Sequence, residues 1–529
     1  MTSCLRGESK IPMNAKGFSK QGEYFDSVSL MMVARELTKM EGILDAAVVM
    51  GTPENKAILE GVGLLLPAFK EAGDTDLLIG FKVEDESVLE KAMQQVDTLL
   101  DGLRHRSAET SDFLSKSIEG ALKVIPDANL ALISVAGRYA ADEGMKALQQ
   151  GLHVMVFSDN VPLEKEIELK NYAKDKGLLV MGPDCGTAII NGVPLAFANV
   201  VNRGDIGIVA ASGTGLQEVS CVISNQDAGI SQAIGTGGRD VWQEVGGIML
   251  LEGLKALKDD EKTRIIVLVS KPPHEDVLQK ITEELQNISK PVVTMFIGAD
   301  PEVIEEAGAI PAGTLEEAGL IAVAFSQGND RETVKTSLEE RTEELKALAA
   351  EEAEKRKESQ KYLSGLFSGG TLCDEAQLIL RDILGNVYSN TPIDPEFKLD
   401  DSWKDREHTI IDLGADEFTI GRPHPMIDFS LRNGRFLEEA QDPEVAVILL
   451  DVVLGYGAHQ RPEEELVTFI REAKAAAKLE GRHLSVVCSV TGTDKDPQNR
   501  KKVKQALKAA GAFVMPSNAA ACELAGYIC

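Results

Sequence analysis

The sequence predicts an α/β protein built from several domains, and three observations support this prediction. The chain has 529 residues, which at about 150 residues per domain corresponds to three or four domains. Aromatic residues make up only 5 %, whereas 47 glycines suit the many tight turns of an α/β fold. Short apolar runs alternate with longer helical patterns, as expected for strands that helices cover on both faces.

Residues 1–112 predict a small N-terminal α/β domain of the ferredoxin-like sandwich type. Helical patterns at 30–40 and 88–103 accompany strand patterns at 46–50 and 77–81. We find no chemical motif in this domain and expect it to dock a partner.

Residues 113–202 are expected to form a second domain with a parallel sheet. Strand patterns at 130–135, 153–157 and 178–181 alternate with helical patterns at 140–150 and 163–176. This βαβαβ order requires right-handed crossovers between parallel strands.

Two further α/β domains are expected at 203–331 and 366–529. The first carries strand patterns at 206–210, 232–234, 265–269 and 292–296, and the second at 409–413, 445–451, 484–490 and 513–515. Residues 332–361 are dense in Glu, Lys and Ala and contain neither Gly nor Pro. Residues 332–365 are therefore expected to form a solvated helical linker with charge pairs four residues apart.

Charge and cysteine content disfavour several classes of function. The chain has 55 Lys and Arg against 84 Asp and Glu, a formal net charge of −29, so nucleic acid and anionic membranes are not expected as partners. Seven scattered cysteines without C-x-x-C spacing indicate reduced thiols in a cytoplasmic protein. We find no secretory signal pattern and no run of about 20 apolar residues, so we expect no membrane span.

Two glycine turns are the strongest functional signal. Ser212-Gly213-Thr214-Gly215 follows a buried-type strand and precedes a helical pattern, and Ser368-Gly369-Gly370-Thr371 has the equivalent place in the last domain. Glycine lets the backbone approach a ligand, and free amides at a helix start attract an anion. An ordinary strand-to-helix turn explains either motif alone, whereas the pair favours a phosphate held between two helix starts.

The loop Gly421-Arg422-Pro423-His424-Pro425 is a second candidate. Its two prolines fix the backbone and orient the side chains between them. Arg422 can grip an oxyanion, and His424 can donate to a developing negative charge or move a proton. The alternative is a rigid surface turn, and we favour function because two prolines restrict the chain more than such a turn requires.

Two more loops are weaker candidates. Gly235-Thr236-Gly237-Gly238-Arg239 exposes backbone beside a cation, although a simple βα loop explains it equally well. Asp184-Cys185-Gly186 ends a strand at the carboxyl edge of a parallel sheet, where ligands of such sheets bind. Asp184 would raise the pKa of Cys185, so we interpret Cys185 as a packed thiol and not a nucleophile. P-loop, HExxH and GxSxG motifs are absent from the sequence, and we expect neither a metal nor an organic cofactor.

Several of these stretches resemble succinyl-CoA synthetase. Met181-Gly182-Pro183-Asp184-Cys185-Gly186 and the turns at Ser212 and Gly235 are similar to its α subunit, and Ile411-Asp412-Leu413-Gly414 resembles the ligase domain of its β subunit. The resemblance implies a partial Rossmann-like CoA-binding-type domain and two flavodoxin-like ligase domains. Nearly the whole chain is similar to the FdrA-type proteins.

Two departures from the synthetase bear on the chemistry. Its α subunit carries a phosphorylated histidine in a Gly-His-Ala-Gly-Ala segment, and Glu306 stands at the matching position here. A carboxylate cannot form a phosphoramidate. The sequence also lacks the glycine loop that opens the CoA-binding domain and an ATP-grasp domain. Acyl-CoA synthesis by this chain alone is therefore disfavoured.

The similarity to FdrA-type proteins implies a subunit of oxamate carbamoyltransferase, which interconverts oxalurate plus phosphate with oxamate plus carbamoyl phosphate in anaerobic allantoin or purine breakdown. It implies two companion subunits, and a homo-oligomer stays open. The phosphate is expected on the two glycine turns, with Arg422, His424 or Arg239 polarising the carbamoyl oxygen. The residues expected to line the small-molecule substrate are Gly237, Gly238, Asp184, Cys185, Gly186 and Pro423. Two alternatives stay open: an acid–CoA ligase whose nucleotide domain lies on another chain, and a non-catalytic scaffold.

Overall fold

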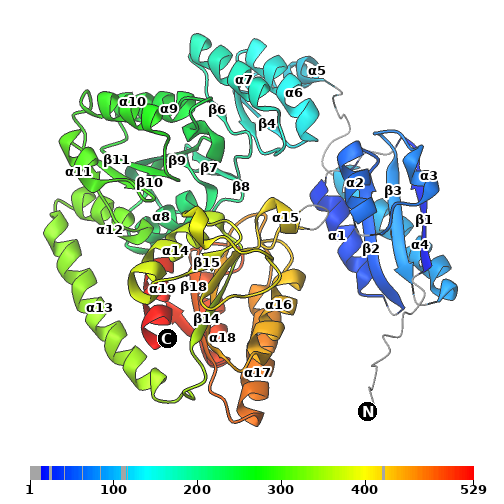
Figure 1. The fold of residues 1–529 in the computed structure, drawn as a ribbon. Helices are drawn as coiled ribbons and strands as arrows, with labels where there is room; N and C mark the ends of the chain where they lie inside the picture. The colour runs from blue at the N-terminus through cyan, green and yellow to red at the C-terminus, as the bar shows by residue number, and fades with distance from the viewer. Residues whose placement is uncertain are drawn as a thin grey trace. The chain divides into compact units, whose positions relative to one another are not determined.

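The computed structural model describes residues 14–22, 25, 27–40, 42–61, 63–83, 85–108, 115, 117–419 and 423–529, so the candidate Arg422 lies outside the described residues. The chain divides into two compact units (Figure 1). The N-terminal unit comprises Met1–Val124 and Asp416–Pro423, and the main unit comprises Ile125–Ala415 and His424–Cys529.

The N-terminal unit contains three antiparallel strands in the order β1-β3-β2. Leu37 of α1 joins Ile79 in an apolar cluster on one face of the sheet, and Phe69 joins Leu78 in a second cluster on the other face. The predicted α/β sandwich is confirmed, and β1 is the strand that the apolar pattern did not reveal. Its elements are β1 (Asn14–Lys20), α1 (Ser27–Thr38), β2 (Ile43–Met50), α2 (Pro53–Gly61), α3 (Pro67–Lys70), β3 (Leu77–Val83), η1 (Glu86–Val88), α4 (Leu89–Ala108), α5 (Ile118–Val124) and α15 (Asp416–Thr419).

The main unit begins with the predicted βαβαβ motif. Three parallel strands pair in chain order: β4 (Leu130–Ile133), β5 (His153–Val156) and β6 (Val180–Met181). Helices α6 (Gly137–Gln149) and α7 (Leu163–Lys176) connect them. α7 ends at Gly177, whose φ of 66° lies in the left-handed region that glycine adopts readily.

A seven-stranded sheet follows, in the order β13-β12-β11-β9-β10-β7-β8. Five strands are parallel, and the β7–β8 hairpin extends the sheet from β10 in antiparallel fashion. The strands are β7 (Thr187–Ile190), β8 (Val193–Ala196), β9 (Arg203–Ala211), β10 (Ile230–Gly235), β11 (Ile265–Ser270), β12 (Val292–Phe296) and β13 (Ile310–Pro311). The helices are α8 (Gly213–Asn225), η2 (Gly238–Val241), α9 (Ile248–Asp259), α10 (Glu275–Leu285), α11 (Pro301–Glu306) and α12 (Leu315–Ser326).

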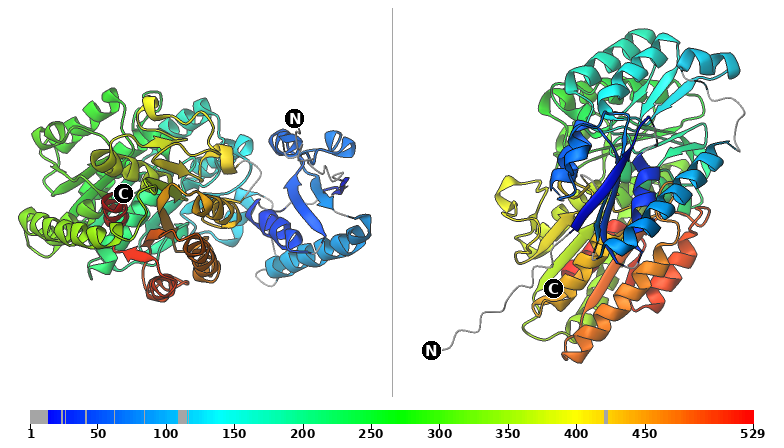
Figure 2. Two further views of the ribbon diagram at one scale, coloured as in Figure 1. Left: turned by 60° about the horizontal axis from the view of Figure 1, so that its bottom comes forward. Right: turned by 90° about the vertical axis from the view of Figure 1, so that its right-hand side faces the viewer.

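The C-terminal part of the main unit forms a six-stranded parallel sheet in the order β15-β16-β14-β17-β18-β19. The strands are β14 (Tyr362–Phe367), β15 (Tyr388–Ser389), β16 (Thr409–Asp412), β17 (Val445–Val453), β18 (Ser485–Thr491) and β19 (Phe513–Met515). The helices are α14 (Gly370–Leu384), η3 (Pro395–Phe397), α16 (Ser430–Gln441), α17 (Pro462–Leu479), α18 (Arg500–Ala509) and α19 (Asn518–Ile528). In the right-hand view of Figure 2, α17 and α18 (orange to red) lie at the opposite end of the main unit from α6 and α7 (cyan).

Helix α13 (Arg331–Ala353) joins the two large sheets. It confirms the predicted linker helix, but it ends at Ala353 and is not wholly solvated. Val334, Leu345 and Ala349 are buried, since α13 packs on α12 and α19. The prediction missed this because the buried positions are few among many charges.

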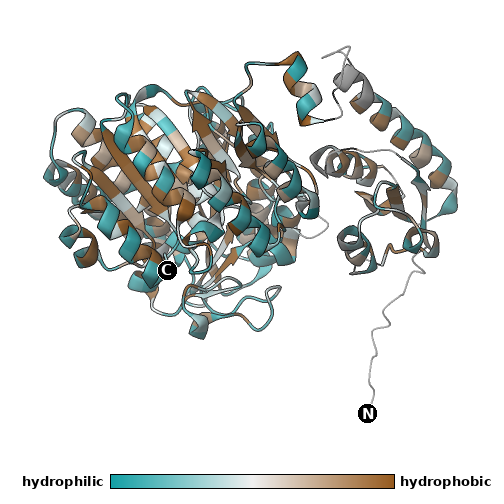
Figure 3. Ribbon diagram, turned by 90° about the horizontal axis from the view of Figure 1, so that it is seen from above, coloured by the Kyte–Doolittle hydropathy of each residue, from teal (hydrophilic) through white to brown (hydrophobic). Residues whose placement is uncertain are grey.

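One apolar core extends across both large sheets. Leu216 of α8 and Leu372 of α14 belong to the same buried cluster, together with Ala520 of α19. The hydrophobic colour concentrates on the central strands of the main unit (Figure 3). The packing of helices between the two sheets therefore holds the first turns of α8 and α14 close to each other in space.

Three general properties bear on function. No helix within the described ranges is long and apolar enough to cross a membrane. The same residues hold no group of three or more His, Cys, Asp or Glu placed to bind a metal ion. Cysteines 185, 221, 373, 488 and 522 are buried as free thiols, and Cys529 is half-buried.

Candidate functional site

The two predicted glycine turns meet in the structure. Ser212 is the N-cap of α8, and its Oγ accepts the amide proton of Gly215 at 3.0 Å. The same Oγ lies 2.6 Å from Oγ1 of Thr371 in the first turn of α14. We call the residues Ser212–Gly215 and Ser368–Thr371 the helix junction.

The helix junction brings together two sets of unpaired backbone donors. The first amides of any helix have no partner within that helix, and the helix dipole adds partial positive charge there. Gly213 and Thr214 supply such amides at α8, and Gly370 and Thr371 supply them at α14. Two helix starts in contact through a hydroxyl pair can therefore hold a small anion.

Asp451 already binds two of the amides that were predicted to hold a phosphate. Its carboxylate, at the carboxyl half of β17, accepts hydrogen bonds from the amides of Ser368 and Gly369, both at 2.8 Å, and from Ser368 Oγ at 2.9 Å. Arg432, which is also buried, lies 3.2 Å from Asp451 Oδ1. Of the four residues predicted here, Gly370 and Thr371 therefore keep amide donors for an anion, whereas the amides of Ser368 and Gly369 already bind Asp451.

A lysine that the sequence analysis did not single out supplies charge beside α14. Lys271 follows β11 directly, and its Nζ lies 2.8 Å from Asp374 Oδ2. A side chain at Gly370 would place its Cβ 3.9 Å from this Nζ. The lysine thus adds a full positive charge to the partial charge of the α14 start.

Asp412 ends β16 next to this lysine. Burial raises its pKa to about 7, although Lys271 favours the charged form; Asp374 and Asp451 raise it further, and the Gly414 amide lowers it. Its Oδ1 accepts that amide at 2.9 Å. A carboxyl group with a pKa near neutrality is suited to accept and return a proton.

His424 lies beside Gly414. Its Nδ1 accepts the amide proton of Met426 at 3.2 Å, so Nε2 carries the ring proton in the neutral form. Burial lowers the His424 pKa to about 4, which keeps the imidazole neutral near pH 7. A Cβ at Gly414 would lie 2.9 Å from Nε2. Pro423 precedes His424 in the chain and is half-buried.

The loop with Cys185 and Gly186 borders the helix junction. A Cβ at Gly213 would lie 3.7 Å from Thr187 Oγ1 and 4.0 Å from the Gly186 Cα. Burial raises the pKa of Cys185 to about 12, which agrees with a packed thiol. The amide of the adjacent Asp184 donates to the Ser158 carbonyl at 3.0 Å.

The second glycine loop packs on the first. A Cβ at Gly235 would lie 2.7 Å from Cys185 Sγ, and one at Gly237 would collide with the Pro183 carbonyl oxygen. Gly238, which begins η2, has open space around its Cα. The glycines at 235 and 237 thus serve close backbone packing.

Arg239 is not brought to the helix junction. Its Nη2 lies 2.8 Å from Glu166 Oε2 and donates to the Val161 carbonyl at 2.9 Å. Glu166 is fully buried and needs positive partners, which Arg239 and the buried Lys170 provide. The predicted role of Arg239 at the carbamoyl oxygen is not supported by this placement.

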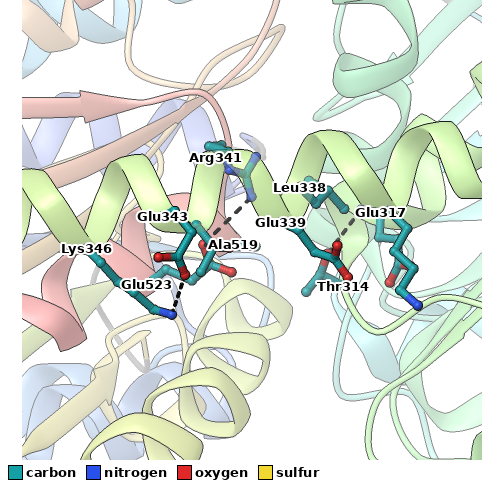
Figure 4. Close-up of a pocket in the computed structure, with 11 residues that line it drawn as sticks. Thr314, Glu317, Leu338, Glu339, Arg341, Glu343, Lys346, Ala519 and Glu523 are labelled. Atoms are coloured by element: carbon teal, nitrogen blue, oxygen red, sulfur yellow. Dashed lines mark hydrogen bonds and ion pairs between the residues drawn. The ribbon is translucent and has the colours of Figure 1, made fainter.

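A hollow in the described part of the chain lies elsewhere, along α13 (Figure 4). It has a volume of about 560 Å³ and is lined by residues of α12, α13 and α19, none of them in the helix junction. Two of its cations are paired: Lys346 lies 2.8 Å from Glu343, and Arg341 lies 2.6 Å from Glu316, which is not a lining residue. We therefore place the candidate site at the helix junction.

Three family models match the chain. The AllF heavy metal-associated domain matches residues 13–114, the CoA binding domain matches residues 201–298, and the CoA-ligase model matches residues 366–528. The last two ranges contain Ser212 and Thr371, respectively.

Among similar proteins, the uncharacterized protein YahF of Escherichia coli (strain K12) is 43 % identical over 506 residues, which is 96 % of this chain and 97 % of that protein. The alpha 2 subunit of the ADP-forming succinate–CoA ligase of Archaeoglobus fulgidus is 28 % identical over 198 residues, covering 37 % of this chain and 67 % of that subunit. Among solved structures, the dinucleotide-forming acetyl-coenzyme A synthetase 1 of Ca. Korarchaeum cryptofilum in complex with phosphate and ADP covers 79 % of this chain and 86 % of its own, with 15 % identity and a TM-score of 0.35.

Proposed function

Because this chain belongs to the family of Escherichia coli YahF and joins CoA-binding and CoA-ligase regions in one polypeptide, we propose that it transfers an acyl group between phosphate and a second acceptor at the helix junction. It is an FdrA/AllF-type protein with succinyl-CoA-synthetase-like domains. In the proposed reaction an acyl phosphate is the common intermediate or substrate.

One observation carries this proposal. Ser212 Oγ and Thr371 Oγ1 are 2.6 Å apart, so the N-terminal ends of α8 and α14 are in contact. The phosphate of an acyl phosphate matches a site made of helix-start amides, hydroxyl groups and the nearby Lys271. Lys271 supplies one positive charge at the place where an anion would bind, and this lysine also pairs with Asp374.

The similarity to succinate–CoA ligase supports CoA as the acceptor. The CoA-ligase and CoA-binding matches include both halves of the helix junction. In this form of the proposal, the CoA thiol attacks the acyl phosphate and phosphate leaves. Any nucleotide-binding domain is supplied by a companion subunit.

The AllF-type N-terminal domain supports a second acceptor, oxamate, with carbamoyl phosphate as donor. Glu306, at the position of the synthetase's phosphorylated histidine, is exposed at the end of α11. A direct transfer between carbamoyl phosphate and oxamate needs no phosphohistidine, which agrees with a glutamate there. Two companion subunits belong to this form of the proposal.

Acceptor-dependent release of phosphate from an acyl phosphate tests both forms. We expect release from carbamoyl phosphate with oxamate, or from acetyl or succinyl phosphate with CoA, by the protein alone or with co-purified companion subunits. Thr371→Val removes the hydroxyl pair and should lower the rate about 10- to 100-fold, as expected for one hydrogen bond near a charged group.

A matched control is the buried pair of Ser231 and Thr263, whose hydroxyl oxygens are 2.7 Å apart at the amino end of β11. Thr263→Val should leave the rate within twofold of the unchanged protein. Equal losses in the two variants would place the effect in folding and not in the site. Absence of release with either acceptor would favour the scaffold alternative.

A further inference from the structure

Three ionisable side chains converge beside the first turn of α14. A Cβ at Gly370 would lie 2.9 Å from Asp412 Oδ2 and 3.9 Å from Lys271 Nζ, and one at Gly414 would lie 2.9 Å from His424 Nε2 and 3.1 Å from Asp412 Oδ1. Because these two glycines have no Cβ, the three side chains can lie directly against the backbone at the start of α14 and after β16. The Lys271 side chain is 44 % exposed, so the cluster is accessible from its side.

Asp412 differs from the two other carboxylates near α14. Asp451 accepts two amides and a hydroxyl and pairs with Arg432, and Asp374 pairs with Lys271. Asp412 Oδ1 accepts the Gly414 amide, whereas no hydrogen bond from the described residues reaches Oδ2. Asp412 Oδ2 is thus a carboxylate oxygen left for a ligand.

We propose that Lys271, Asp412 and His424 form the acyl subsite of the transfer reaction, in which Asp412 takes the proton of the attacking acceptor. This inference rests on the proposed function and names the residues of its chemical step. Lys271 Nζ and the Nε2–H of His424 bind the carbonyl oxygen of the acyl phosphate and stabilise the negative charge that develops there.

The step is balanced in atoms and electrons. The N–H of oxamate or the S–H of CoA attacks the carbonyl carbon, and its proton passes to Asp412 Oδ2. A C–N or C–S bond forms, the bond between the carbonyl carbon and the phosphate oxygen breaks, and phosphate leaves with that electron pair. The amides of Gly370 and Thr371 receive the leaving phosphate.

The surroundings of Asp412 suit this role. The groups that face it are Lys271 after β11, Cys373 and Asp374 of α14, Asp451 of β17 and His424. Burial and two neighbouring carboxylates raise the pKa of Asp412 to about 7 against the effect of Lys271. Burial lowers the pKa of His424 to about 4, so its imidazole is neutral near pH 7. His424 therefore acts as a neutral hydrogen-bond donor and not as a cation.

The test is the pH dependence of acceptor-dependent phosphate release in Asp412→Asn. We expect the rate of this variant to fall at least 100-fold, as for loss of a general base, and its pH profile to lose the limb near pH 7 of the unchanged protein. Phosphate affinity, measured by calorimetry, should change less than threefold. Glu375→Gln is the matched control, because burial raises the pKa of this α14 carboxyl to about 8 and it bonds to Asn518 and Leu315 instead of the cluster.

Lys271→Met is a second variant, and its unfolding is compared with that of the unchanged protein because Asp374 loses its ion pair. It should raise the KM for the acyl phosphate at least tenfold and move the limb near pH 7 to higher pH, because Lys271 favours the charged form of Asp412. An Asp412→Asn variant that retains this limb and a rate within threefold of the unchanged protein overturns the inference while the proposed function stands. No release by the unchanged protein overturns both.

Discussion

Replacing Lys170 by methionine should strongly destabilise the main unit. Lys170 is fully buried in α7, and its Nζ lies 2.8 Å from Glu166 Oε1, 2.8 Å from Asp240 Oδ1 and 3.0 Å from the Thr236 carbonyl oxygen. With Arg239 included, this network holds two positive and two negative charges. Removing the ammonium leaves one net negative charge in a buried site.

The expected loss in the free energy of unfolding is about 3–5 kcal/mol, the usual cost of removing one partner of a buried ion pair. Urea unfolding followed by far-UV circular dichroism and by the fluorescence of the two tryptophans, Trp242 after η2 and Trp403, measures it. Lys165→Met on the same helix is the control, since Lys165 is half exposed and lies 3.2 Å from Glu168. The free energy of unfolding should change little in this variant, because solvent screens an exposed ion pair. A loss below about 1 kcal/mol in Lys170→Met would refute the reasoning that the ammonium is needed to balance the two carboxylates.

Two further predictions concern the candidate site. Gly215→Ala should lower the free energy of unfolding by about 1–3 kcal/mol in a thermal unfolding assay, because the new Cβ would collide with Ser212 Oγ and lie 3.0 Å from Val269 Cγ1. Gly213→Ala is the control, because the atom nearest to its new Cβ is 3.7 Å away, and its loss should stay below about 1 kcal/mol. Burial lowers the pKa of His424 from 6.5 to about 4, so its contribution to stability is complete above pH 6.5 and is lost as the pH falls towards 4. Between pH 8 and pH 5 the unchanged protein should therefore lose about 2 kcal/mol relative to His424→Gln, and parallel pH curves in urea unfolding would contradict this.

The apolar runs predicted the strands that helices cover on both faces. All six residues of β11 are buried, and such a strand is continuous in apolar residues. The edge elements escaped notice because they are short or polar, as in β1. The β7–β8 hairpin did carry a signal: Asn191-Gly192 separates its strands with φ of 51° and 81°, which is typical of a tight hairpin turn.

The glycine turns of the candidate site were predicted, whereas the charged residues around them were not. Asp451 accepts a hydrogen bond from Ser368, which is 83 residues away in the sequence, and no local sequence pattern predicts such a contact. Lys271 and Asp412 are single polar residues at the ends of apolar strands, and a sheet order is needed to bring them together. The sequence likewise does not indicate that Arg239 pairs with Glu166, because Glu166 belongs to a helix far away in the sequence.

The helix α13, about 34 Å long at 1.5 Å per residue, has a further consequence for assembly. The CoA-binding and CoA-ligase regions of this chain share one polypeptide. Their association is intramolecular, with an effective concentration that dilution does not change. Cutting the chain between Ala353 and Tyr362 would turn the meeting of α8 and α14 into a bimolecular equilibrium, so that any activity of the helix junction would begin to depend on protein concentration.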